Sequence, residues 1–375
     1  MSYRRAVIPA LVGSLLITLF LWWAGASAPA LQLPGTANVF DVQSAAELQR
    51  WLTPWSYGSP GAPMSGGPGG GDTALSGGTQ YADLYNTAMQ IRFVAVFAFF
   101  LAGALLLIRR IPPAHGRTPA TLLALWAWGP VAGTLAVTVS APWLIASRGH
   151  GSYRFLPQLA GVIASSGPIT VFAALLTALL TVPVARITAK DADPVPMRQV
   201  PPRAARLAAS TGTAVIALSL VILSYGSVAA GIQTSFGGGG LLSEPGDLLR
   251  EWLLLGGWTT PGTTPLGDWL LLRAADVLLL AVVWWSLRLL PGLLTRASLP
   301  AMAVGAVCAT VLGLLVSQVL RTATGDRAAV WGPVYLFSTL GGGVPAALTF
   351  GLAAGATALL TLRWAGGRDT DDVSR

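Results

Sequence analysis

The hydrophobic residues of this chain form long continuous runs separated by short polar segments. A helix needs about 20 apolar residues to cross a lipid bilayer. Eight runs reach or approach that length, at 6–26, 88–108, 119–144, 158–184, 208–232, 269–290, 298–320 and 334–362. A membrane β-barrel would instead show short stretches in which apolar and polar residues alternate. The pattern therefore predicts an all-α polytopic membrane protein with eight transmembrane helices.

The beginning of the chain recurs 201 residues later. The matches extend from Arg5 and Arg206 to Pro60-Gly61 and Pro261-Gly262. Between these ends, the matched pairs are Leu19/Leu220, Gly25/Gly226, Ala28/Ala229, Gln32/Gln233 and Leu48-Trp51-Leu52/Leu249-Trp252-Leu253. A repeat of this length indicates a duplicated structural unit. Each copy contains four runs, and an even number keeps the copies in the same orientation. We therefore expect two parallel four-helix repeats related by a pseudo-twofold axis along the membrane normal.

The repeat also predicts the domain organisation. The first repeat is expected at 1–185 and the second at 208–364, with a cytoplasmic linker at 186–207 and a cytoplasmic tail at 365–375. A stretch rich in Gly, Ser and Pro at 58–79 occurs only in the first copy. It lacks apolar periodicity, which is typical of a flexible external loop.

Basic residues predict which side of the membrane each loop faces. The termini and the loops near 109–118, 186–206 and 288–296 hold fifteen Arg and Lys residues. The other side holds six, Arg50, Arg148, Arg154, Arg250, Arg321 and Arg327. Positive residues concentrate on the cytoplasmic side, so both termini are expected there. This rule also accounts for the net charge of +8 without a nucleic-acid partner.

Composition supports the membrane class. Hydrophobic residues make up 53% of the chain and charged residues 10%, against about 25% charged in soluble domains. Lys190 is the one lysine, while Ala, Gly and Arg are abundant. This usage is typical of a GC-rich bacterial genome, so the expected location is the bacterial plasma membrane.

The first run has features of a cleaved signal peptide. It follows the basic pair Arg4-Arg5 and ends near Ala26-Ser27-Ala28, which has the small residues of a cleavage site. Pro29 would directly follow the cut and is unfavourable there. The matching run at 208–232 is internal. We therefore expect the first run to be a retained helix.

The repeated external segments predict short helices at the membrane interface. Ser44 and Glu47 have the spacing of a helix-capping box. Apolar residues then recur at helical intervals, and tryptophan favours the membrane interface. The tryptophans assigned to these interfacial helices are Trp51, Trp55, Trp252 and Trp258. Two roles stay open for them, a lid that packs on the bundle and a surface that grips a substrate.

Catalytic signatures are scarce in this chain. His115 and His150 are expected on opposite sides of the membrane, which excludes a histidine-based metal site or triad. Lys190 follows Ala189 rather than glycine, so there is no phosphate-binding Gly-Lys-Ser/Thr loop. Cys308 is the one cysteine and cannot form an intramolecular disulfide. The sequence therefore indicates no catalytic residue, metal or cofactor, and any ATP would act through a separate subunit.

Charged residues inside the runs are better candidates for a site, because burying charge in a membrane is costly. Arg92 and Arg273 occupy matching places, roughly 6 Å below the outer surface at the helical rise per residue. Asp276 lies one turn deeper than Arg273, where the first copy has Ala95. These residues either reach toward lipid headgroups or line a central outward-facing site for an anionic substrate or lipid phosphate.

Glycine and proline patterns add a second indication of a site. Gly129 and Gly133, like Gly351 and Gly355, have the spacing that lets membrane helices approach closely. Pro168 and Pro345 follow glycines at matching places and are candidate helix breaks near the outer leaflet. Helix breaks at matching places in two repeats are typical of transport sites, although both residues are ordinary in membrane helices.

Three functional hypotheses follow from these features. The first is a non-enzymatic, permease-like protein with an outward-facing site near the pseudo-twofold axis. The second is a non-catalytic assembly or regulatory subunit whose partner is an ATPase or an envelope enzyme. The third is a lipid-linked sugar transferase that uses an external carboxylate. The external acids available to it are Asp41, Glu47, Asp72, Asp83, Glu244, Asp247, Glu251, Asp268 and Asp326.

Overall fold

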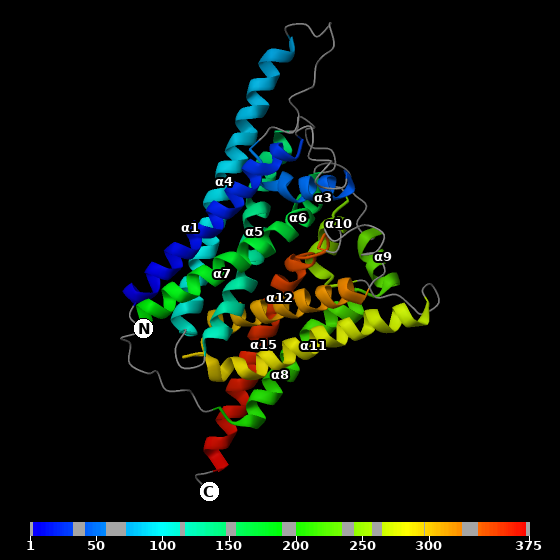
Figure 1. Ribbon diagram of the computed structural model, residues 1–375. Coiled ribbons are helices and arrows are strands. Elements are labelled where there is room, and N and C mark those ends of the chain that lie inside the picture. The colour runs from blue at the N-terminus through cyan, green and yellow to red at the C-terminus, as the bar shows by residue number, and fades with distance from the viewer. Residues whose placement is uncertain are drawn as a thin grey trace.

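The regular elements of the protein are helices. The computed structural model describes residues 3–32, 42–57, 73–112, 117–147, 155–189, 200–234, 244–256, 265–295, 297–324 and 337–372. Within these ranges, eight helices are long and apolar enough to cross a membrane (Figure 1). They are α1 (Tyr3–Ser27), α4 (Thr73–Arg110), α5 (Thr118–Ala146), α7 (Gly167–Ala189), α8 (Pro202–Ala217) with its continuation η3 (Leu218–Leu223), α11 (Leu266–Leu293), α12 (Leu299–Thr324) and α15 (Val344–Asp372). Each predicted run overlaps one of them, which confirms the multi-pass helical class.

Three predicted runs have different bounds in the structure. The run 158–184 is divided between α6 (Phe155–Ala164) and α7, with a turn at Ser165 and Ser166. The run 208–232 is divided between α8 with η3 and the separate helix α9 (Gly226–Thr234). Of the run 334–362, residues 337–343 form turns and α15 begins at Val344, while 334–336 lie outside the described residues. Hydropathy does not register a turn made of small or apolar residues, so these boundaries were not visible in the sequence.

The segments expected to be polar connections are partly helical. Helix α4 begins at Thr73, inside the range 58–79 that was expected to be a loop. The remaining residues of that range, 58–72, lie outside the described part of the chain. Helix α15 continues to Asp372, within the expected tail. Glycine and serine lower helix stability by about 1 kcal/mol or less per residue, so they do not by themselves end a helix.

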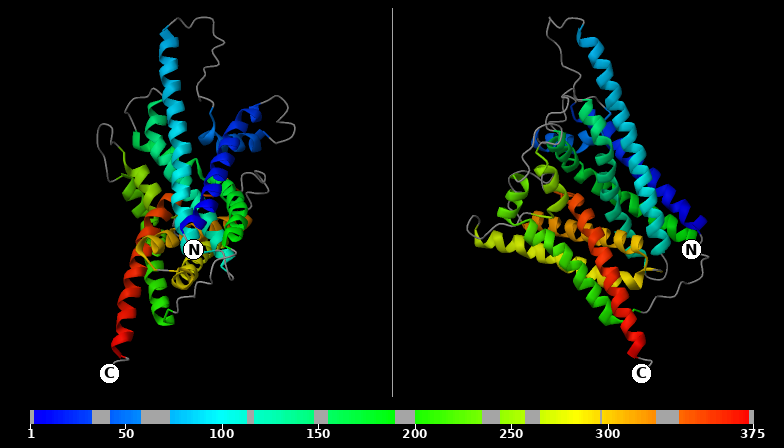
Figure 2. Two further views of the ribbon diagram at one scale, coloured as in Figure 1. Left: turned by 90° about the vertical axis from the view of Figure 1, so that its left-hand side faces the viewer. Right: turned by 180° about the vertical axis from the view of Figure 1, so that it is seen from behind.

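Each half of the chain contributes four helices in contact with one another. In the first half, α1 and α5 each pack against both α4 and α7. In the second half, α8 and α12 each pack against both α11 and α15. Helices α5 and α12 form the main contact between the halves (Figure 2). Helix α1 begins and α15 ends on the same side of the bundle, opposite the short helices α3 (Val42–Leu52), α6 and α10 (Gly246–Leu253).

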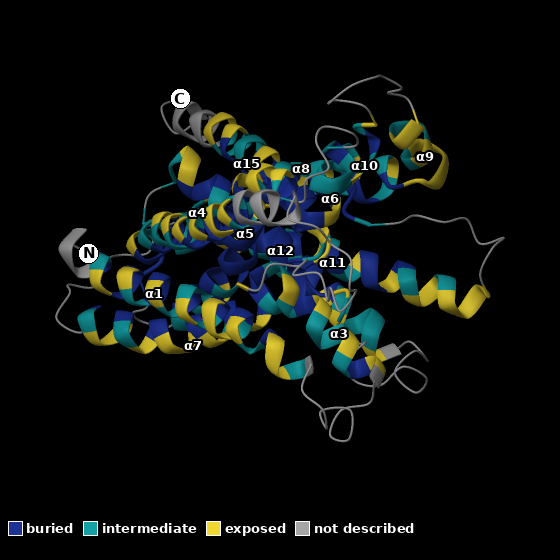
Figure 3. Ribbon diagram, turned by 90° about the horizontal axis from the view of Figure 1, so that it is seen from above, coloured by how far each residue is buried: buried dark blue, intermediate teal, exposed yellow. Residues whose placement is uncertain are grey.

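Burial separates the central helices from the outer ones. The most apolar windows of α5 and α12 are both 67% buried, whereas those of α8 and α11 are 33% buried. Seen from above, buried residues are concentrated at the centre and exposed residues on the outward faces of α1, α7 and α11 (Figure 3). The exposed residues on these outer helices are largely apolar, as expected for surfaces that contact lipid.

Small residues allow the central helices to approach closely. A Cβ atom added to Gly129 of α5 would lie 2.1 Å from the Cβ of Ala174 on α7. A Cβ atom added to Gly355 of α15 would lie 2.5 Å from the Cα of Ala303 on α12. Such contacts increase dispersion attraction between helices that gain little from the hydrophobic effect in lipid. The close approach predicted for these glycine pairs is therefore present within each half.

The two halves also meet where α7 and α15 begin. A Cβ atom added to Gly167 would lie 2.5 Å from the carbonyl oxygen of Leu340. Gly341 has φ +80°, a conformation that favours glycine. Gln318 of α12 binds this segment, donating to the Gly342 carbonyl at 2.9 Å and accepting from the Gly341 N–H at 3.1 Å. The segment before α15 is therefore held against the start of α7.

The two candidate helix breaks lie at helix starts. Pro168 is the second residue of α7, and Pro345 is the second residue of α15. Proline is favoured in the first turn because the N–H that it lacks has no helical partner there. The chain therefore turns before each proline, and neither proline interrupts the helix that follows it.

Candidate functional site

The segment after α3 packs at the end of the first half that lies opposite the start of α1. The 3-10 helix η2 (Thr53–Trp55) lies against α1, where a Cβ atom added to Gly25 would be 1.8 Å from the Trp55 carbonyl oxygen. The Trp55 side chain is fully buried and contacts the ring of Phe93 edge-on at 5.7 Å. This contact requires glycine at position 25, because any side chain there would displace η2.

The three predicted interfacial tryptophans that lie within the described residues pack against other parts of the protein. Trp51 is buried and stacks on Phe172 of α7 at 6.5 Å. Trp252 of α10 is partly buried against the core, and Trp258 lies outside the described residues. Helix α10 contacts both α6 and α15, so it spans the junction between the halves. For Trp51 and Trp55, these contacts are those expected of a lid that packs on the bundle.

Arg92 of α4 is fully buried within the first half. Its Nε donates to the hydroxyl of Ser140 on α5 at 2.8 Å. One Nη1 proton is donated to the carbonyl oxygen of Pro54 in η2. The guanidinium carbon lies 5.8 Å from the centre of the Trp55 ring, within the range of a cation–π contact. Two segments distant in sequence, η2 and α5, therefore fix the position of this cation.

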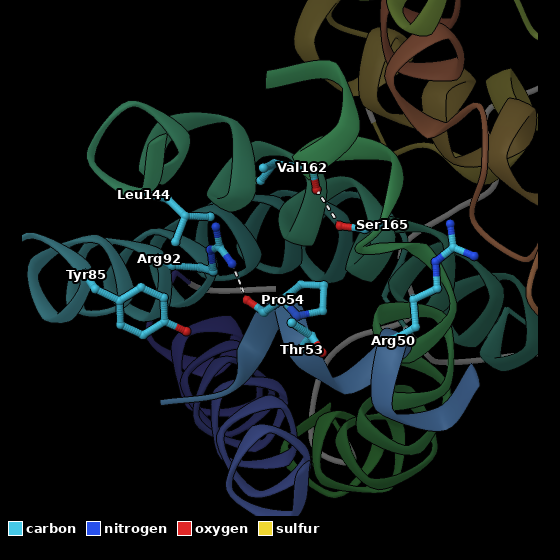
Figure 4. A pocket seen from close by; sticks show the side chains of 8 residues that line it. All are labelled: Arg50, Thr53, Pro54, Tyr85, Arg92, Leu144, Val162 and Ser165. Atoms are coloured by element: carbon cyan, nitrogen blue, oxygen red, sulfur yellow. Dashed lines mark hydrogen bonds between the residues drawn. The ribbon is translucent and has the colours of Figure 1, made fainter. Parts of the chain in front are cut away.

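A cavity opens beside Arg92 (Figure 4). Its volume is about 180 Å³, smaller than the roughly 300–1,000 Å³ typical of sites for whole drug-sized ligands. It is lined by Arg50, Thr53, Pro54, Tyr85, Arg92, Leu144, Val162 and Ser165. Of these lining residues, which belong to the described part of the chain, two are cationic and none is acidic. The cavity therefore suits a small anionic group or the anionic end of a larger molecule.

The two arginines of the cavity have different surroundings. Arg50 lies on α3 with a largely exposed side chain, and its Nη1 is 3.8 Å from a carboxylate oxygen of Glu47. Arg92 lies in the interior, where electrostatic attraction is stronger than in water. Tyr85 stabilises the rim by donating its hydroxyl proton to the Ser56 carbonyl at 2.5 Å.

A second charged cluster lies in the second half. An Nη1 atom of Arg273 on α11 is 3.0 Å from one oxygen of Asp276, and Arg321 on α12 donates to the other oxygen. The Asp276 side chain is 4% exposed, that of Arg273 9% and that of Arg321 30%. The carboxylate therefore binds both guanidinium groups, while Arg321 also reaches solvent.

The structure brings together some predicted site residues and separates others. Arg273 and Asp276 form an ion pair, whereas neither lines the cavity beside Arg92. Arg321, Tyr85 and Ser140 were not among the candidates. One signal for these partners was present in the sequence. The spacing of 181 residues that aligns Arg92 with Arg273 also aligns Ser140 with Arg321.

No family model matches the chain, and neither the curated proteins nor the solved structures include a match to it. His115 and His150 lie outside the described residues. Among the residues that the structure describes, no group of three or more His, Cys, Asp or Glu could hold a metal ion. The Arg92 cavity and the Asp276 cluster are therefore the basis for a functional assignment.

Helix α10 is expected to make protein stability depend on pH. Burial raises the pKa of Glu251 above its ordinary value of 4.5, with Arg250 lowering it and Asp247 raising it. The folded state then holds this proton more tightly than the unfolded state, so stability should fall as pH rises from about 4.5 through the raised pKa. Melting temperatures measured across this range should show the decline in the wild type and a weaker decline in Glu251→Gln.

The matched control is Glu244→Gln, at an exposed residue two positions before α10. This variant is expected to keep the pH dependence of the wild type. A Glu251→Gln protein with the same pH dependence as the wild type would contradict the assignment to Glu251.

Proposed function

We propose that this protein is a permease-like membrane protein whose outward-facing site binds an anionic group at Arg92. The observation that carries the proposal is that two arginines, the exposed Arg50 and the fully buried Arg92, line one cavity. Charge buried in a membrane protein is costly and commonly serves transport or ligand binding. A hydrogen-bonded arginine also suits recognition of carboxylate or phosphate groups.

The proposal places this site in one of two parallel four-helix repeats. Three features support the repeats: the residues matched at a spacing of 201, the matched arginines, and the same order of helix contacts in the two halves. Short helices cover the outer end of each half, α3 in the first and α10 in the second (Figure 1). In this arrangement the termini face the cytoplasm and the Arg92 cavity opens outside.

Transport is tested by replacing Arg92 with glutamine in cells that express the full chain. Anionic small molecules inside and outside the cells are compared by mass spectrometry with cells that lack the protein. The wild type is expected to change the distribution of at least one anionic compound, and Arg92→Gln to reduce that change by about tenfold or more, because a charged hydrogen-bond donor is lost.

The matched control is Arg288→Gln. Arg288 also lies on a spanning helix, but its guanidinium carbon is 5.4 Å from the centre of the Trp284 ring and it does not line the cavity. This variant is expected to transport like the wild type. Equal transport by Arg92→Gln and Arg288→Gln, at matched amounts in the membrane, would remove Arg92 from the site.

A second candidate function is an assembly or regulatory subunit. The observation that favours it is the apolar character of the central contact between halves. Helix α5 contains no charged residue, and α12 contains Arg321 alone, whereas proton-coupled carriers usually hold several charged groups in their spans. Affinity purification after gentle detergent extraction should then recover a defined partner in a fixed ratio. Crosslinking in cells that yields the isolated chain alone would count against this function.

A further inference from the structure

Ser165 lines the cavity with a hydroxyl group whose proton is already donated. It is a half-buried residue in the turn between α6 and α7. Its hydroxyl donates to the Val162 carbonyl at 3.0 Å (Figure 4), and its N–H donates to the Gly161 carbonyl at 3.2 Å. A hydroxyl group has one proton and two lone pairs, so this oxygen can still accept a hydrogen bond. Ser165 therefore offers an acceptor to a molecule in the cavity.

The neutral polar residues on the opposite side of the cavity are arranged in the same way. Thr53 of η2 donates its hydroxyl proton to the Gln49 carbonyl at 2.6 Å. Tyr85 donates its hydroxyl proton to a main-chain carbonyl, and Pro54 has no N–H. The hydroxyl oxygen of Thr53, like that of Ser165, can therefore accept a hydrogen bond but has no second proton to donate.

A ligand that complements these acceptors must bring protons of its own. Hydroxyl and ammonium groups both supply them, whereas an alkyl chain would leave the acceptors facing apolar atoms. An ammonium group would lie near the guanidinium groups of Arg50 and Arg92, and none of the described residues that line the cavity is acidic. Like charges placed together oppose binding. The cavity lining therefore favours hydroxyl groups.

We propose that the site takes a hydroxylated anion, and that Ser165 and Thr53 determine its specificity by accepting hydrogen bonds from the ligand's hydroxyl groups. The inference rests on the proposed function, which accounts for the anionic part of the ligand. A glycerol phosphate group has this chemistry, either as a free phosphate ester or as the headgroup of phosphatidylglycerol. The cavity volume of about 180 Å³ suits a group of this small size.

The first test compares two ligands that differ in their hydroxyl groups. The full wild-type chain is purified in an uncharged detergent, and titration calorimetry at constant pH and ionic strength measures its affinity for glycerol 3-phosphate and for propyl phosphate. Glycerol 3-phosphate is expected to bind roughly tenfold more tightly, because each neutral hydrogen bond changes affinity a few-fold and unpaired acceptors reject the alkyl analogue. Equal affinities would overturn this inference and leave the proposed anion site in place.

Variants assign the preference to particular hydroxyl groups. Ser165→Ala is expected to lose most of the preference for glycerol 3-phosphate and to keep its affinity for propyl phosphate. Thr53→Val should lose less, because Thr53 is exposed and water competes for its lone pairs. The matched control is Ser147→Ala. The Ser147 hydroxyl also donates to a carbonyl three residues earlier, at 2.7 Å, but does not line the cavity.

A full preference in both Ser165→Ala and Thr53→Val would overturn the role of these residues. If Ser165→Ala does not elute as the wild type does, the comparison of ligands on the wild type and on Thr53→Val decides, because neither measurement depends on that variant.

Reconstituted protein identifies the source of the hydroxylated anion. Phosphatidylglycerol and phosphatidylmethanol both carry a phosphodiester, but only phosphatidylglycerol has hydroxyl groups on its headgroup. A lipid ligand predicts a higher melting temperature in phosphatidylglycerol vesicles than in phosphatidylmethanol vesicles, and loss of this difference in Ser165→Ala. A soluble ligand predicts equal melting in both and a further rise with glycerol 3-phosphate. A wild type that binds neither phosphate ester and melts equally in both lipids would overturn the inference and the proposed anion site together.

Discussion

Replacement of Asp276 by alanine is expected to destabilise the protein by about 3–5 kcal/mol, the range for removing one partner of a buried ion pair. The carboxylate is 4% exposed and binds both Arg273 and Arg321. Its removal would leave two guanidinium groups close together, with repulsion in place of attraction. Denaturant titration of the purified chain, followed by tryptophan fluorescence, measures the change.

The control for this variant is Asp268→Ala, which removes an exposed acid from the first turn of the same helix. It is expected to change stability by about 0.5 kcal/mol or less. A combined replacement of Asp276 and Arg273 by leucine should recover part of the loss, because it removes the more buried cation and leaves Arg321, which also reaches solvent. Equal stability of Asp276→Ala and Asp268→Ala would contradict the structural role of the cluster.

Replacement of Gly25 by alanine is expected to weaken both stability and ligand binding. The added Cβ would lie 1.8 Å from the Trp55 carbonyl oxygen, a backbone atom that no side-chain rotation can move. Overpacking of this kind costs about 1–3 kcal/mol. Since η2 also carries the Pro54 carbonyl that accepts from Arg92, its displacement should also reduce transport in the assay proposed for Arg92→Gln.

The matched control is Gly231→Ala on α9, where the added Cβ would meet no atom within 4 Å. This variant should be as stable as the wild type or more stable, because alanine is the better helix former by about 1 kcal/mol. If Gly25→Ala melted like Gly231→Ala and transported like the wild type, η2 would not depend on close contact with α1.

Much of the fold was predictable because each spanning helix must satisfy its backbone hydrogen bonds internally and place apolar side chains in lipid. Both requirements leave a long apolar run in the sequence, and all eight predicted runs correspond to helices. The interruptions were less visible. The turn at Ser165 and Ser166 and the separation of α9 from η3 fall within stretches whose composition differs little from that of their neighbours.

The candidate site was predictable only in part. Arg92, Arg273 and Asp276 were recognisable because charge is rare in apolar runs. Their partners were not, since Ser140 and the Pro54 carbonyl resemble many other polar groups until the helices pack together. Arg321 was grouped with external residues because it lies near the end of α12, from which its side chain nevertheless reaches Asp276.

The sequence by itself determined the membrane class, the number of spanning helices and the identity of the costly intramembrane charges. These depend on hydropathy and length, which are local properties of the chain. Tertiary structure decided which groups surround each charge: a neutral carbonyl, a hydroxyl and a cavity at Arg92, and a carboxylate shared with Arg321 at Arg273. The physical reason is that these partners come from helices up to 48 residues apart in the chain, and only helix packing brings them within hydrogen-bonding distance.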